Sequence, residues 1–203
     1  RAVVAARLAA PGTEWDVFRT LQRGQFTTSL LLDDADQLRS TLEGAQLDGV
    51  DAAAIVGRID DEDVLEVYEQ DRAAARSAAG TPGSLQGKTS DPDGVERYSA
   101  PSLVLEQNGR RLEAAGFQRI EAYDVLVANL DPTLDRRGPA EDAAEVLAYF
   151  PNGLVTQEVA AVLQQGNDDV DRAAAELQLI DLLAAGKVRR EPLGDDARWW
   201  WLG

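Results

Sequence analysis

The feature that most constrains the fold is the dipeptide Asn108-Gly109, which separates two runs that carry apolar side chains. Both central residues of a type I′ turn need positive φ, and Asn and Gly tolerate it best. The sequence therefore predicts an antiparallel hairpin over residues 102–117. Its first strand opens on Ala100-Pro101, where a proline is tolerated because no ladder donor is lost.

A hairpin of this kind needs further structure beside it. An isolated two-stranded hairpin is marginally stable in water, and this one carries Leu103, Leu105, Leu112 and Phe117. A helix is predicted over residues 119–130. The rest of the sequence offers almost no strands that could complete a sheet.

The residues around the hairpin resemble a known family. The stretches are RYSAPSLV at 97–104, GFQ at 116–118 and YDVLVANLDP at 123–132. They are similar to the C-terminal half of a thioredoxin fold, and in particular to the DsbA-like thiol-disulfide oxidoreductases, a group that includes FrnE-type and 2-hydroxychromene-2-carboxylate isomerase-like proteins. The resemblance covers residues 1–131.

The resemblance implies a fold and a site. An X-Pro bond is more commonly trans, but the family pattern predicts a cis bond at Ala100-Pro101, at the end of a strand bordering a cleft. Ser99, Ala100 and Pro101 are then the expected substrate-binding residues. In the family, a strand, a helix headed by a Cys-x-x-Cys-type motif and another strand precede the helical insert, so the nucleophilic cysteine is expected upstream of Arg1.

The composition limits the chemistry of the chain itself. The sequence has 203 residues and contains no cysteine, histidine or methionine. It therefore lacks a thiolate nucleophile, soft metal ligands and the usual near-neutral general base. We predict no catalytic residue and no metal site in this chain.

The charge balance is strongly acidic, with 36 acidic and 20 basic residues and a net charge of −16. This argues against a nucleic-acid partner held by phosphate neutralisation. The favoured interpretation is an acidic surface that promotes solubility, and the alternative is adaptation to salt. No stretch is long and apolar enough to span a membrane and the start is no signal peptide, so we expect a cytoplasmic protein, or one whose export signal is not in this chain.

The N-terminal part, residues 1–80, is predicted to be a helical insert. Trp15, Phe18 and Leu21 are spaced to bury one stripe of a helix capped by Thr13. The segment 26–32 is a short strand or a loop. The acidic run 60–63 is interpreted as the start of a helix over 64–79 rather than a metal site, because carboxylates complement the helix dipole there. The stretch 80–95 is rich in Gly, Pro and Ser and is predicted to be a loop, a candidate lid.

A different module follows a linker at residues 132–139. Residues 140–203 are predicted to form three helices and a two-stranded wing, similar to a winged helix-turn-helix. Thr156 is expected to cap the second helix, and Asn167 or Asp168 the third. In the run Trp199-Trp200-Trp201, Trp200 should face away from its neighbours.

DNA binding by this module is not expected. From Asp131 onward there are 14 acidic and 7 basic residues, and the third helix carries several acids against Arg172 alone. The fold class expected overall is α/β, or α+β by content: a thioredoxin-like domain with a helical insert, then a small winged-helix-like domain.

Three functions stay open. The first is a thiol-disulfide oxidoreductase or isomerase acting on a protein substrate or a small thiol, with its cysteines outside this chain. The second is a redox-inactive interaction module on the same fold. The third is a glutathione-dependent isomerase of a small aromatic substrate, for which glutathione is the only cofactor considered. The oligomeric state is left open.

Overall fold

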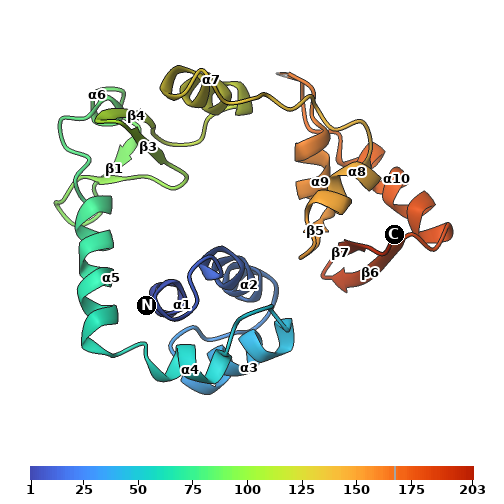
Figure 1. Cartoon of the computed structure of the whole chain (residues 1–203), viewed down its shortest axis with the longest axis horizontal. Coiled ribbons are helices and arrows are strands. Elements are labelled where there is room, and N and C mark those ends of the chain that lie inside the picture. The colour runs from blue at the N-terminus through green and yellow to red at the C-terminus, as the bar shows by residue number, and fades with distance from the viewer. Residues whose placement is uncertain (167) are drawn as a thin grey trace. The chain divides into compact units, whose positions relative to one another are not determined.

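The computed structural model describes residues 1–166 and 168–203 and divides the chain into two compact units, Arg1–Ser77 and Ala78–Gly203. The fold is mixed: helices predominate, and the strands form small antiparallel sheets (Figure 1). This mixed content of helices and small sheets confirms the expected α+β composition. The predicted linker 132–139 lies inside the second unit.

All the regular secondary structure described in the first unit is helical. Its elements are α1 (Ala2–Ala9), α2 (Glu14–Thr27), α3 (Ala35–Ala45), α4 (Ala52–Gly57) and α5 (Glu62–Ala75). Asp34 and Asp51 cap α3 and α4, because their carboxylates accept hydrogen bonds from backbone amides of the first turn.

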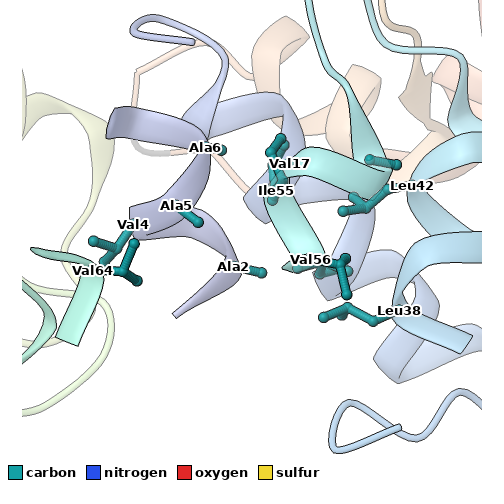
Figure 2. Packing of buried hydrophobic residues seen from close by; sticks show 12 residues of the cluster. Ala2, Val4, Ala5, Ala6, Val17, Leu38, Leu42, Ile55, Val56 and Val64 are labelled. Carbon is teal, nitrogen blue, oxygen red and sulfur yellow. The ribbon is translucent and has the colours of Figure 1, made fainter. Parts of the chain in front are cut away.

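The core of this unit is built around the alanine-rich helix α1. Ala5 and Ala6 are fully buried, and their small side chains allow close packing of the neighbouring helices. Figure 2 shows Val17, Ile55 and Leu42 grouped on one side of α1, with Val64 meeting Val4 on the other. The helical insert predicted for this part of the chain therefore has a hydrophobic core of its own.

Two predictions for α2 are wrong. Trp15 is 65% exposed and Phe18 40% exposed, so only Leu21 of the predicted stripe is buried. The buried face instead runs through Val17, Leu21 and Gly24, and the side chain of Leu30 lies against Gly24. The segment 26–32, predicted to be a strand or a loop, is a loop from residue 28 onward, and its first two residues belong to the end of α2.

The acidic run at 60–63 begins a helix, as predicted. Asp61 is the N-cap of α5, and its carboxylate accepts from Arg58 at 3.1 Å. Asp63 pairs with the same guanidinium at 2.6 Å, and Asp60 pairs with Arg1. These contacts satisfy the acids with protein cations.

The second unit begins with the elements that surround the predicted hairpin. They are α6 (Pro82–Leu85), β1 (Thr89–Ser90), β2 (Arg97–Tyr98), β3 (Leu103–Gln107), β4 (Arg110–Ala114) and α7 (Ile120–Leu130). The stretch 80–95 is therefore not a plain loop: it contains a short helix and a strand that pairs with β2. The hairpin β3–β4 is confirmed, with Asn108 at φ 51° and Gly109 at φ 75°.

The C-terminal part contains α8 (Ala143–Tyr149), β5 (Leu154–Val155), α9 (Thr156–Leu163), α10 (Arg172–Ala184), β6 (Val188–Leu193) and β7 (Asp196–Trp201). The three predicted helices and the β6–β7 wing are confirmed. A third strand, β5, was missed, and it makes β7 the central strand of the order β5-β7-β6.

The predicted helix caps in this part need correction. Thr156 is the first residue of α9 rather than its cap, and the Val155 amide donates to Glu158 Oε2 at 3.0 Å. Asp168 does not cap α10, because that helix begins later, with Asp171 accepting from the Ala174 amide. The other proposed cap, Asn167, lies outside the described residues.

Successive side chains of β7 point to opposite faces of the sheet, so Trp200 faces away from Trp199 and Trp201, as predicted. Trp199 is 1% exposed and belongs to the core with Val146, Leu147 and Leu179. Trp200 is on the opposite face, where the guanidinium of Arg189 lies 3.8 Å from its ring centroid. In the part of the chain that the structure describes, we find no helix with the length and apolar character needed to cross a membrane.

Candidate functional site

The segment from Ser99 to Ser102 joins β2 to β3 and contains the predicted substrate-binding residues. The Ala100-Pro101 bond is cis, which confirms the prediction made for it. Ala100 and Pro101 are exposed, whereas Ser99 and Ser102 are half-buried. The strand begins at Leu103, two residues after the proline rather than at it.

Two serines hold this segment against its surroundings. The Ser99 hydroxyl donates to the carbonyl oxygen of Lys88 at 2.7 Å, and the Ser102 hydroxyl donates to the Ser99 carbonyl. The Ser102 oxygen also accepts from the Gly116 amide at 2.9 Å. The exposed pair Ala100-Pro101 is therefore flanked on both sides by side-chain to backbone hydrogen bonds.

Glu113 connects three elements beside this segment. Its Oε2 accepts from the Tyr98 hydroxyl at 3.0 Å, and its Oε1 accepts from the Gly83 amide at 2.5 Å. Tyr98 in turn accepts from Arg111 at 3.1 Å. One carboxylate on β4 thus links β2 and the start of α6 to the hairpin.

Gly83 has no room for a side chain. A Cβ atom there would lie 2.4 Å from Ala115 Cβ and 3.2 Å from Glu113 Oε1. The close approach of α6 to the end of β4 brings the Gly83 amide within reach of Glu113. This approach is why glycine follows Pro82 in the sequence.

The other face of the hairpin contacts α7. Gln107 Nε2 donates to Asp131 Oδ2 at 2.8 Å, and Arg110 reaches the Leu130 carbonyl at 3.4 Å. Hydrogen bonds from the Thr133 hydroxyl, from Gln107 and from the Thr133 amide lower the pKa of Asp131. This carboxylate therefore joins the end of α7 to β3 in its ionised form.

Much of the apolar surface of this region is uncovered. No residue of α7 is buried, although the helix is rich in Val and Leu. Phe117 is 83% exposed, Ile120 61%, Val125 52% and Leu103 44%. The hairpin is a sheet of two strands, and no other strand pairs with it among the described residues.

A small cavity of about 290 Å³ lies near the hairpin. It is lined by residues of α6, β4 and α7 that include Gly83, Glu113, Ala115, Val125 and Leu126. Ser99, Ala100 and Pro101 are not among its lining residues. The structure therefore does not join the predicted substrate-binding residues to this cavity.

Charged groups next to the segment are held ionised by hydrogen bonds. The Thr89 hydroxyl donates to Glu96 Oε1 at 2.5 Å, and this bond is the main reason that the pKa of Glu96 is lowered. Neither Glu96 nor Asp131 has the raised pKa expected of a proton donor near neutral pH. Both carboxylates are therefore ionised near neutral pH.

Sequence reasoning identified the proline segment but missed Glu113 and Tyr98. They are 15 residues apart in sequence and lie in two different sheets, β1–β2 and β3–β4, so only the tertiary fold brings them together. No spacing pattern marks such a contact. Among residues 1–166 and 168–203, no group of three acids is placed to hold a metal ion.

The sequence was also compared with known proteins. No protein-family model matches the chain. No curated protein matches it either.

Proposed function

We propose that this chain is part of a thiol-disulfide oxidoreductase or isomerase that resembles the DsbA-like family. In this proposal, residues 78–131 form the C-terminal portion of a thioredoxin-like domain, with residues 1–77 as its helical insert. The redox cysteines belong to a strand-helix-strand unit that is not among these 203 residues. The expected compartment is the cytoplasm.

The observation that carries the proposal is the uncovered apolar surface of β3, β4 and α7. A two-stranded hairpin is marginal alone, and here a half-exposed Leu103 and a helix without a single buried residue accompany it. Exposed apolar surface of this kind marks a place where other structure packs. A further strand beside the hairpin and a helix on its face would cover Leu103 and the exposed apolar residues of α7.

The segment Ser99-Ala100-Pro101 is the proposed substrate-binding element. Its serines are bonded to neighbouring backbone, while Ala100 is exposed. An extended peptide can pair with an exposed backbone of this kind as an added strand does, through main-chain hydrogen bonds. A thiolate of the absent unit would attack a disulfide of the bound substrate: the mixed disulfide forms as the substrate S–S bond breaks, and the second substrate sulfur leaves as a thiolate.

One observation favours a second candidate, a redox-inactive interaction module. The chain contains no cysteine, so nothing within it can perform disulfide exchange. If the same fold served only to bind, the exposed segment would take an extended peptide and release it unchanged. Peptide binding without any thiol chemistry distinguishes this candidate from the first.

The decisive experiment starts from the gene. The coding sequence upstream of the Arg1 codon should encode a Cys-x-x-Cys-type motif, and the purified full-length product should titrate with a thiol reagent. One thiol should react well below the ordinary cysteine pKa of about 8.5, since a helix N-terminus stabilises the thiolate. A full-length product without cysteine would replace the oxidoreductase with the interaction module, and a single cysteine would favour a glutathione-dependent isomerase.

A further inference from the structure

Helix α10 is apolar on two sides, and only one of them is buried. Ala175 and Leu179 face the core of the C-terminal part at 1% and 0% exposure. On the other side, Leu177 is 66% exposed and Ile180 47% exposed. The exposed residues Ala173 and Ala184 extend the line in both directions. We call these four residues the α10 stripe.

The spacing of the α10 stripe is that of a helix-pairing seam. Its members are separated by four, three and four residues, the alternation that places side chains along one line of a coiled coil. The two large side chains are central and the two alanines are at the ends. A second helix can therefore lie along the stripe with its backbone close to the alanines.

The charges at the two ends of α10 are opposite. Asp168, Asp169 and Asp171 precede the helix and are all exposed. Lys187, Arg189 and Arg190 follow it and are also exposed. An antiparallel pair of α10 helices sets the acidic end of each against the basic end of the other, and it also aligns the two helix dipoles favourably. A parallel pair would set like charges together at both ends.

The acids beside the stripe favour the same orientation. Glu176 and Asp181 lie on opposite flanks of it and are five residues apart. In a parallel pair, flanking positions with this separation face each other across the seam, so Glu176 of one copy would oppose Asp181 of the other. In the antiparallel pair, the flank that carries Glu176 lies beside the same flank of the partner, and the flank that carries Asp181 does likewise. Glu176 of one copy therefore no longer faces Asp181 of the other.

We propose that the α10 stripe binds a second copy of this chain through an antiparallel, two-fold symmetric contact. The contact is self-complementary, since Leu177 of each copy lies against Ile180 of the other. It does not depend on the proposed redox function. A stripe of about three turns is smaller than the ~1,200 Å² buried in stable complexes, so we expect a dimer that forms in the tens of micromolar range.

The first test is the molar mass in solution of the 203-residue chain. Light scattering at about 100 µM, a concentration above that expected range, should give a weight-average mass about 1.5 to 1.8 times the 21.9 kDa of one chain, since a dimer of this affinity is only partly formed there. The variant Leu177→Glu/Ile180→Glu should return to one chain mass with unchanged helical circular dichroism. Leu134→Glu, at a site that is 56% exposed and outside α10, should remain a dimer. A wild-type monomer at this concentration overturns the proposal.

The second test reports the orientation and does not depend on a disruptive variant. The chain has no native cysteine, so Ala173→Cys/Ala184→Cys introduces the only two thiols. Within one helix these positions are about 16 Å apart, too far for a disulfide, which needs Cα atoms within about 7 Å. Oxidation should cross-link the double variant into a covalent dimer and leave each single variant uncross-linked. Efficient cross-linking by Ala173→Cys alone would contradict the antiparallel contact.

Discussion

The Tyr98 hydroxyl donates to Glu113 Oε2 at 3.0 Å, and this bond joins the strand before the proline segment to the second strand of the hairpin. The other oxygen of Glu113 accepts from the Gly83 amide at 2.5 Å. One carboxylate therefore fixes where the segment Ser99–Ser102 leaves β2. If this segment presents backbone to a substrate, its position depends on Glu113.

The variant Glu113→Ala should loosen the proline segment. It removes two hydrogen bonds to a charged acceptor, each worth about 1.5–3 kcal/mol at most. The amides of Gly83 and Gly116, which donate to Glu113 and to Ser102, should exchange with solvent at least about tenfold faster, which corresponds to about 1.4 kcal/mol. Glu113→Gln, which retains an acceptor for the Gly83 amide, is the control and should show a smaller change. Unchanged exchange in Glu113→Ala would mean that the carboxylate does not position the segment.

The C-terminal core depends on a buried hydrogen bond between Trp199 Nε1 and Thr156 Oγ1, at 2.9 Å. Thr156→Val keeps the shape of the side chain but leaves the indole N–H without its acceptor. The free energy of unfolding should fall by about 1–3 kcal/mol, measured by urea denaturation followed by tryptophan fluorescence. Thr156→Ser retains the hydroxyl and should lose less. Equal losses in the two variants would show that the bond contributes little.

The link between β3 and the end of α7 should weaken in acid. Hydrogen bonds from Thr133 and Gln107 lower the pKa of Asp131 in the folded state. A lowered folded-state pKa means that the stabilisation is present above the unfolded value of about 3.9 and is lost as pH falls through the folded pKa. The side-chain amide signals of Gln107 in NMR spectra should therefore shift only below about pH 3.9. Asp131→Asn should abolish this titration, and a midpoint above that value would contradict the assignment.

The C-terminal module should not bind duplex DNA at physiological salt. Residues from Asp131 onward include 14 acidic and 7 basic residues, and the exposed side of α10 is apolar where a recognition helix would carry cations. Fluorescence anisotropy with a labelled duplex should show no saturable binding. Salt-sensitive binding in the low micromolar range would overturn this prediction.

Local signals in the sequence predicted most of the elements. The Asn108-Gly109 turn predicted the hairpin with its strands, and the acidic run at 60–63 predicted the start of α5. Both are short-range effects, in which a residue favours the backbone conformation of its immediate neighbours. The cis bond at Pro101 was predicted from the resemblance and not from local chemistry.

Tertiary effects explain what the sequence analysis missed. The buried face of α2 runs through Val17 and Leu21, which pack in the core of the first unit, and not through the largest side chains, so Trp15 is exposed. Strand β5 has only two residues and exists because it pairs with β7. The role of Glu113 likewise requires β2, α6 and β4 to be assembled first.

The most direct measurement of the central claim is disulfide exchange with insulin as substrate. This chain should reduce insulin in the presence of dithiothreitol no faster than buffer, because it contains no cysteine to form the mixed disulfide. The gene product extended upstream by a strand-helix-strand unit, about 30 residues or more, should accelerate the reaction, and replacement of its cysteines by serine should abolish that acceleration. An extended product that contains cysteine yet remains as inert as this chain would contradict the oxidoreductase proposal.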